Sequence, residues 1–161
     1  MRTTQTAPVS SRPRLHTLAA FLAVIGLVDS IYLTVTHLTG EDVTCLASSG
    51  CSEVLSSAYA SVGKIPLGAF GILGYFAAFS LATLAAFGYA RALTLLRVVV
   101  AGMLATTLWL LYVQAFILHA FCDFCLLSAG LTMSLSAIVT IGYFIERKHR
   151  TAGEQTPALQ S

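Results

Sequence analysis

Two cysteines separated by two residues, Cys122 and Cys125, stand at the start of a long apolar run. If that run is a helix, both sulfurs lie near one face of its first turn. The N-terminus of a helix carries partial positive charge and free backbone N–H groups, which favour a thiolate over a thiol. The sequence therefore predicts that Cys122 and Cys125 make and break a disulfide.

The only other cysteines, Cys45 and Cys51, lie far away in a long polar segment, residues 39–64. An even but low cysteine count fits two redox pairs better than a secreted disulfide scaffold, which would be rich in cysteine and poor in apolar residues. The two pairs can work together only if the elements between them bring them to the same side of the molecule.

The composition indicates that these elements span a membrane. Hydrophobic residues make up 57% of the 161-residue chain and charged residues only 10%, which is too apolar for an ordinary soluble domain. Four apolar runs are each long enough to cross a bilayer as a helix, at residues 15–38, 66–90, 97–119 and 123–145. A net charge of +2 without a basic stripe excludes nucleic acid as an expected partner.

We therefore expect an all-α integral membrane protein with the lipid bilayer as its surroundings. Its four-transmembrane-helix bundle occupies residues 15–146, between cytoplasmic tails at 1–14 and 147–161. The long external loop between the first and second spans contains a short helix within residues 52–62, where apolar residues form one stripe.

The basic residues predict the orientation of the bundle. Lysine and arginine concentrate in short cytoplasmic loops, and only Lys64 of the nine lies on the opposite side of this topology. The other eight are Arg2, Arg12, Arg14, Arg91, Arg97, Arg147, Lys148 and Arg150, with Arg91 and Arg97 at the turn between spans two and three. Both termini are then cytoplasmic, and all four cysteines face the outside, where disulfides form and persist.

Four external cysteines support a thiol–disulfide relay, in which a thiolate attacks a disulfide through a mixed disulfide. A mobile loop pair, Cys45 and Cys51, can face a soluble partner, and an interfacial pair, Cys122 and Cys125, can face a lipid-soluble quinone. Two alternatives remain open: a non-catalytic membrane protein with structural disulfides, or a zinc site made of four cysteines. The five residues between Cys45 and Cys51 are unusual spacing for such a zinc site, and we expect no metal.

Three polar residues inside the spans are candidates for a ligand site. Asp29, in the first span, is either a proton donor or acceptor near a buried ligand or a packing hydrogen-bond partner, because an acid within a span is costly. Tyr112 and Gln114, in the outer half of the third span, either line a cavity or, like other interfacial aromatic and polar residues, lie at the membrane surface.

The pattern of motifs resembles the vitamin K epoxide reductase family in its bacterial form, over roughly residues 15–145. The resemblance rests on Asp29-Ser30-Ile31-Tyr32-Leu33-Thr34, the Cys45 and Cys51 loop pair, Ser56-Ser57, Pro66-Leu67-Gly68-Ala69-Phe70-Gly71 and Cys122-Asp123-Phe124-Cys125. It implies a four-helix bundle around a quinone (menaquinone, ubiquinone or a vitamin K-type quinone), capped by the loop, in a bacterial plasma (inner) membrane.

The resemblance also implies a role for each cysteine. Cys125 lies next to the quinone and delivers electrons to it, and Cys122 is its disulfide partner. Cys51 exchanges with Cys122, and Cys45 exchanges with a soluble thiol partner. Ser57, or Ser56 beside it, holds the loop over the site. Because the chain ends without a fused thioredoxin-like domain, the partner is expected to be a separate thioredoxin-fold protein outside the membrane, similar to disulfide-bond protein A.

Two departures from the animal members concern the quinone contacts. Those members carry an asparagine at the start of span two and a tyrosine four residues after the last cysteine, where this chain has Leu67-Gly68 and Ala129. We therefore take Asp29, Gln114 and Tyr112 as candidates to contact the quinone oxygens. The unrelated disulfide-bond protein B type has its two cysteine pairs in the reverse order, which argues against it.

Overall fold

The computed structural model describes residues 13–40, 50–63 and 65–155, so Cys45 and Lys64 lie outside the described residues. The elements are α1 (Pro13–Thr39), α2 (Cys51–Ser56), the 3-10 turn η1 (Ala58–Ala60), β1 (Ser61–Val62), β2 (Ile65–Pro66), α3 (Leu67–Ala86), α4 (Ala90–Tyr112), the π-helical segment η2 (Val113–Leu118) and α5 (Asp123–Gln155). Four stretches are long and apolar enough to cross a membrane: Leu15–Thr39, Leu67–Ala86, Arg91–Leu118 and Asp123–Ile145. The predicted all-α membrane bundle is confirmed.

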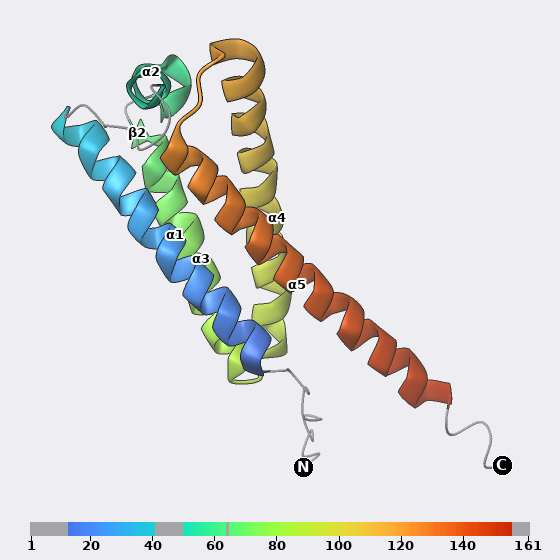
Figure 1. The fold of residues 1–161 in the computed structure, drawn as a ribbon. Coiled ribbons are helices and arrows are strands. Elements are labelled where there is room, and N and C mark those ends of the chain that lie inside the picture. The colour runs from blue at the N-terminus through green and yellow to red at the C-terminus, as the bar shows by residue number, and fades with distance from the viewer. Residues whose placement is uncertain (1–12, 41–49, 64, 156–161) are drawn as a thin grey trace.

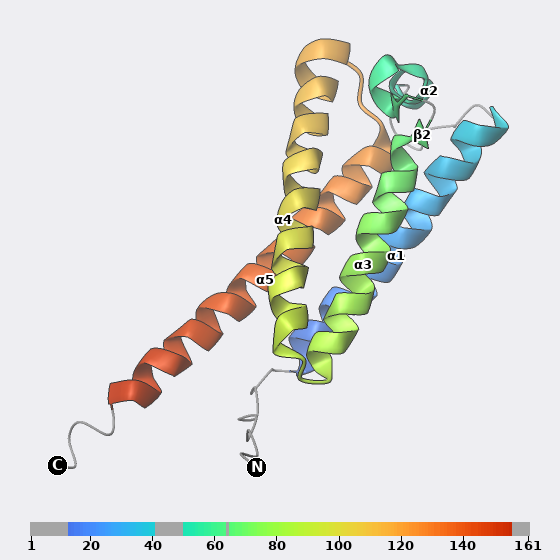
Figure 2. The same ribbon diagram turned by 180° about the vertical axis from the view of Figure 1, so that it is seen from behind.

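The four long helices run the length of the molecule, and the short elements cap one end (Figure 1). α1 and α3 lie side by side, α4 stands next to α3, and α5 crosses the bundle obliquely (Figures 1 and 2). The first turn of α1 and the last turn of α5 lie at the end opposite the α2 cap. The buried core joins all four helices through mostly small residues, Ala19, Ala23, Ala78, Ala82, Leu96, Val100 and Leu135.

Glycines let α1 and α3 approach closely. A Cβ added at Gly68 would lie 2.6 Å from the Thr34 hydroxyl and 3.2 Å from the backbone of α1. A Cβ at Gly71 would lie 2.6 Å from the Ser30 hydroxyl, and one at Gly26 would overlap the ring of Tyr75. In lipid, the hydrophobic effect does not drive helices together. Helices associate there through close packing of their backbones at small residues. This contact fixes α1 and α3 as one wall of the site.

Three predicted boundaries differ from the structure. The turn between the second and third spans is at Phe87–Tyr89, where Gly88 adopts a φ of 91° that favours glycine. Arg91 and Arg97 therefore lie on α4 rather than flanking the turn, and Arg97 lies 4.5 Å above the ring centre of Tyr143. α5 continues to Gln155, through most of the predicted C-terminal tail.

The external cap differs in detail from the single helix predicted over residues 52–62. α2 ends at Ser56, and the chain continues through η1 into a two-residue antiparallel hairpin in which Ser61 pairs with Pro66 and Val62 with Ile65. Gly63, with a φ of 68°, occupies the turn. Pro66, which lacks an N–H, stands directly before the first residue of α3. The hairpin therefore ties the cap to the start of α3.

Candidate functional site

Cys122 occupies the N-cap position of α5. Its carbonyl accepts the first helical hydrogen bond, from the Leu126 N–H at 2.9 Å. Its sulfur accepts a hydrogen bond from the backbone N–H of Cys125 at 3.4 Å, as an N-cap side chain does with the third residue of a helix. Both thiols are free, and Cys122 is completely buried. The helix N-terminus therefore points its unpaired donors and its positive partial charge at this sulfur.

This environment lowers the pKa of the Cys122 thiol from 9.0 to about 7. The largest cause is the hydrogen bond from the Cys125 side chain, and the backbone N–H groups of Cys125 and Phe124 act in the same direction. Burial of the thiolate opposes them. A thiolate is the attacking species in disulfide exchange, so Cys122 is the nucleophile of the pair near neutral pH.

Three side chains and one backbone reversal place Cys122 and Cys125. After η2 the chain turns at His119, whose φ of 50° is in the left-handed region and unusual for a residue other than glycine. The Gln114 Oε1 atom accepts a hydrogen bond from the Cys122 N–H at 3.3 Å, and Gln114 is buried. On the other side, the ring of Tyr32 from α1 packs against Phe124 with 5.0 Å between ring centroids.

The cap brings a second cysteine to this place. Cys51, the first residue of α2, is disulfide-bonded, and it is buried in one cluster with Val54, Ala120 and Cys122. The neighbouring Gly50 lies so close to the chain before α5 that an added Cβ would be 2.8 Å from the Phe121 carbonyl oxygen. A disulfide-bonded cysteine of the cap and a free, low-pKa thiol of the bundle therefore share one buried cluster.

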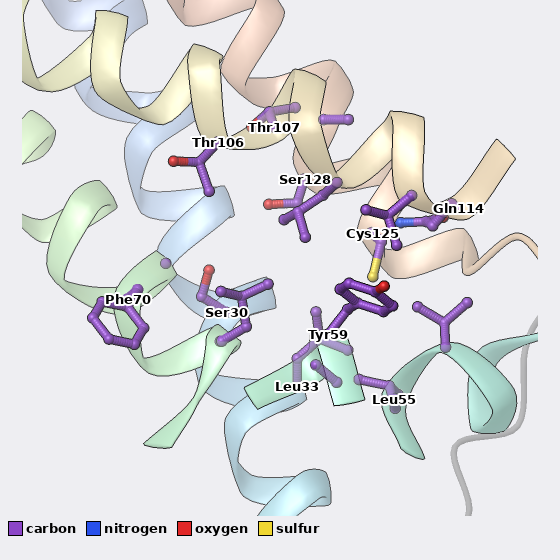
Figure 3. Close-up of a pocket in the computed structure, with 18 of the residues that line it drawn as sticks. Ser30, Leu33, Leu55, Tyr59, Phe70, Thr106, Thr107, Gln114, Cys125 and Ser128 are labelled. Atoms are coloured by element: carbon purple, nitrogen blue, oxygen red, sulfur yellow. The ribbon is translucent and has the colours of Figure 1, made fainter. Parts of the chain in front are cut away.

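Beneath the cap, the bundle encloses a cavity of about 250 Å³. Its wall is mainly apolar, with residues from all four long helices, α2 and η1. Cys125 projects into it from α5, and Tyr59 reaches it from the cap (Figure 3). Phe70 of α3 lies at its edge and is 45% exposed, so the cavity reaches the outer surface of the bundle there. A mostly apolar cavity with a few polar groups is typical of a small-molecule site.

The sequence model of the vitamin K epoxide reductase family matches residues 17–140 of the 161-residue chain. The chain belongs to the vitamin K epoxide reductase family. Membership supports a membrane thiol–disulfide oxidoreductase in general terms, and the family generally uses quinone substrates. The resemblance inferred from the motifs is confirmed.

Besides Cys125, two of the predicted ligand contacts, Gln114 and Ser57, line the cavity. Gln114, whose Oε1 atom is committed to Cys122, keeps its Nε2 donor for another partner. Ser57 also lines the cavity, and its hydroxyl donates to the Val54 carbonyl at 2.7 Å, which closes the end of α2. Ser56 is exposed and bonds within α2 instead.

The other two predicted contacts lie outside the cavity wall. Tyr112 is 50% exposed and stacks between Trp109 and Phe116 on the outer surface of α4. Asp29 is buried on α1, and its Oδ2 atom has no hydrogen-bond partner among the described residues. The alternative in which Asp29 makes a packing hydrogen bond is therefore not realised at that oxygen within the described part of the chain.

The sequence did not single out several polar residues of the cavity wall, namely His37, Tyr59, Tyr75, Ser128 and Thr132. Ser128 and Thr132 follow Cys125 by three and seven residues on one helix face, a spacing that was available as a signal. In this member of the family, Ala129 and Leu67-Gly68, which replace the polar residues of the animal pattern, also line the cavity. No group of three or more His, Cys, Asp or Glu side chains within the described ranges is arranged to hold a metal ion.

Proposed function

We propose that this chain is a quinone-dependent thiol–disulfide oxidoreductase that supports disulfide-bond formation. Electrons pass from a thioredoxin-fold protein outside the membrane to Cys45 and Cys51, then to Cys122 and Cys125, and finally to a quinone in the cavity. The observation that carries the proposal is the position of the α5 pair, with Cys122 buried against Cys51 and Cys125 facing the cavity.

The first internal step is an exchange between the two cysteine pairs. The reduced loop pair attacks the Cys122–Cys125 disulfide, with Cys51 bonding to the Cys122 sulfur and Cys125 leaving as a thiol. The Cys45 thiolate then attacks Cys51 and releases Cys122. The loop gains a disulfide and loses two electrons and two protons. The α5 pair gains both electrons and one proton, on Cys125, because Cys122 leaves as a thiolate; the second proton passes to a nearby base. The low pKa of Cys122 makes it a good leaving group in this second attack.

The cavity suits a quinone ring on three counts. Its wall is mainly apolar, it reaches the outer surface of the bundle at Phe70, and Cys125 supplies a thiol beside Gln114 and Tyr59 (Figure 3). A bound quinone supplies an acceptor for two electrons and two protons and leaves as a hydroquinone. The chain's own part is to present the reduced pair, exclude bulk water with the α2 cap, and re-form the Cys122–Cys125 disulfide as the electrons leave.

Proton balance gives roles to Gln114 and Asp29. When Cys122 is a thiolate and Cys125 a thiol, the pair carries one proton, whereas the hydroquinone takes up two. A second acid is therefore required, and we assign this role to Asp29, a buried carboxyl of α1 about one turn from Gly26. The Gln114 Nε2 group is positioned to donate a hydrogen bond to the quinone oxygen beside Cys125. Ser57 holds the end of the cap in place.

The orientation of the chain follows from its charges. With the eight clustered basic residues in the cytoplasm of a bacterium, the α2 cap faces the extracytoplasmic space, where a separate protein similar to disulfide-bond protein A docks on the loop. Such a partner is oxidised by the loop disulfide and passes the disulfide on to its own substrates. The protein is then a multi-pass protein of the plasma (inner) membrane with both termini inside.

The test is quinone reduction by the purified protein in detergent, with two alternative electron donors: a reduced thioredoxin-fold protein and a small dithiol. We expect Cys122→Ala and Cys125→Ala to abolish turnover with both donors. Cys45→Ala and Cys51→Ala should abolish turnover with the protein donor and retain part of it with the small dithiol, which can reduce the α5 pair directly.

Ser134→Ala serves as the matched control, because this exposed residue of α5 bonds only to the Gly130 carbonyl and lies outside the cavity wall. It should turn over at the wild-type rate with both donors. Normal turnover of Cys125→Ala would contradict the assignment of the electron-donating thiol. No quinone reduction by the wild type, together with zinc bound by the protein or disulfides inert to every dithiol, would favour the structural alternatives.

A further inference from the structure

A second polar group lies in the cavity wall, deeper in the bundle than Cys125. The Tyr75 hydroxyl from α3 donates to the Ser128 carbonyl at 2.9 Å. It also lies 3.0 Å from the Ser128 hydroxyl and 2.9 Å from the Thr132 hydroxyl, both on α5. All three residues line the cavity, and Tyr75 and Thr132 are each only 2% exposed. We call these three side chains the hydroxyl cluster.

The backbone holds this cluster in a fixed place. The Tyr75 ring lies against Gly26 of α1, where any residue with a Cβ atom would overlap the ring. From there the ring spans the interior and joins α3 to α5 through its hydroxyl. Three elements therefore determine the position of one oxygen atom, and the two α5 hydroxyls are oriented by it.

Counting donors and acceptors shows that the cluster can accept a ligand without losing an obligatory bond. The single Tyr75 hydrogen goes to the Ser128 carbonyl, so the Ser128 and Thr132 hydroxyls donate to the two lone pairs of the Tyr75 oxygen. A hydroxyl that turns its hydrogen toward a ligand leaves behind only a vacant lone pair on an oxygen that is still hydrogen-bonded. That exchange is cheap compared with leaving a buried donor unpaired.

Hydroxyls also suit a ligand that changes its hydrogen-bonding character during the reaction. A quinone oxygen only accepts hydrogen bonds, whereas the corresponding hydroquinone oxygen also donates. Ser and Thr hydroxyls can do both, by rotation about one bond. A carboxylate, which only accepts, or an ammonium group, which only donates, would bind one of the two forms poorly.

We propose that the Ser128 and Thr132 hydroxyls, held by Tyr75, bind the quinone oxygen that lies deeper in the bundle. This inference rests on the proposed quinone reduction. The ring then lies along α5, with one oxygen near the Gln114 amide and Cys125 beside the ring (Figure 3). The animal members of the family make polar quinone contacts at the two positions where this chain has Ala129 and Leu67. The hydroxyl cluster supplies polar contacts in their place.

The spacing along α5 is compatible with this arrangement. Gln114 is anchored at the level of Cys122, and at ~1.5 Å per residue Ser128 lies ~9 Å and Thr132 ~15 Å farther along the axis. Two hydrogen bonds of ~2.8 Å each leave roughly 3 to 9 Å between them for the ligand. A ring that carries two oxygens at opposite positions fits within this interval.

The test compares binding of two probes of nearly the same shape, menadione and 2-methylnaphthalene, which lacks both oxygens. Their affinities for the purified full-length protein are measured by calorimetry in detergent. In Ser128→Ala combined with Thr132→Val we expect menadione to bind about 3- to 10-fold more weakly, from the loss of about one net hydrogen bond. The affinity for 2-methylnaphthalene should change less than about 2-fold. Ser134→Ala, on the same helix but outside the cavity, should change neither.

Tyr75→Phe provides a second variant, because it keeps the ring packed on Gly26 and removes only the oxygen that holds the two hydroxyls. We expect it to weaken menadione binding and raise the KM for menadione. Unchanged menadione affinity in both variants, or an equal loss for both probes, would overturn the assignment. If wild-type protein binds menadione through the cluster but does not reduce it, the proposed function fails and the binding site stands.

Discussion

Replacing Cys125 by alanine is expected to raise the pKa of Cys122. The side-chain hydrogen bond from Cys125 is the largest cause of the lowered value of about 7, so its loss moves the pKa of Cys122 toward 9.0. Cys125→Ser is the matched variant, because serine keeps a donor at the same position and should hold the pKa near 7. Both variants lack the electron-donating thiol, so they differ only in the hydrogen bond.

The size of the kinetic effect follows from two opposing trends. At pH 7 a thiol of pKa 7 is roughly half ionised and one of pKa 9 about 1% ionised, a loss of about 50-fold in attacking thiolate. The more basic thiolate is intrinsically more nucleophilic, by about 8-fold for two pKa units at a Brønsted coefficient of ~0.45. The loss of thiolate is larger than the gain in nucleophilicity. At pH 7, Cys122 of the alanine variant should therefore attack the loop disulfide about 6-fold more slowly than Cys122 of the serine variant. Above about pH 8 the order should reverse.

The assay combines an equilibrium and a rate measurement. The pKa of Cys122 is obtained from the ultraviolet absorbance of the thiolate as a function of pH, which does not need a reagent to reach a fully buried sulfur. The rate is followed by alkylation of the loop thiol that Cys122 displaces. Equal pKa values in the alanine and serine variants, or a value near 9 in the serine variant, would refute the reasoning about the hydrogen bond.

Three further predictions concern the surroundings of the site. Gly68→Ala should lower the free energy of unfolding by about 1–3 kcal/mol, because its Cβ would meet the backbone of α1; Gly130→Ala, which meets nothing within 4 Å, should not, as thermal unfolding of the two would show. Gln114→Leu leaves the buried N–H of Cys122 unpaired and should cost about 1–3 kcal/mol and slow quinone reduction; Gln114→Glu, which keeps an acceptor, should recover most of the stability. Tyr112→Leu should leave the KM for a short-chain quinone within about 2-fold of wild type, since this side chain lies on the outer surface, and a large rise in KM would place it in the site after all.

The four spans could be predicted from the sequence because each is an apolar run of about the length that a bilayer requires, and length alone decides that question. The position of Cys122 and Cys125 at the start of the fourth span could also be predicted, because the apolar run begins directly after them. The turn at Gly88 was missed because the arginines at 91 and 97 were taken as its flanks, and a helix near the membrane surface accommodates arginine.

The cavity contacts were harder to predict because helices that are apolar on every side carry no periodic signal for the face that turns inward. Tyr112 and Gln114 are only two residues apart, and one faces outward while the other faces the cavity. Residues two apart lie on nearly opposite sides of a helix, but nothing in this apolar run showed which of the two faces inward. Tyr75 lies within an apolar span rich in small residues, and only the structure brings its hydroxyl to Ser128 and Thr132.

The most direct test of the relay is to trap its central intermediate. In the double variant Cys45→Ala with Cys125→Ala, only Cys51 and Cys122 remain, and we expect mild oxidation to join them in a disulfide that mass spectrometry identifies within one chain. The matched variant Cys45→Ala with Cys122→Ala leaves Cys51 and Cys125. Cys125 packs against the edge of the Cys51 cluster but projects its thiol into the cavity, so we expect it to form no such bond. A Cys51–Cys122 disulfide in the first variant alone is the predicted result. Failure of Cys51 and Cys122 to join, or equal joining of Cys51 to Cys125, would contradict the proposed path of the electrons.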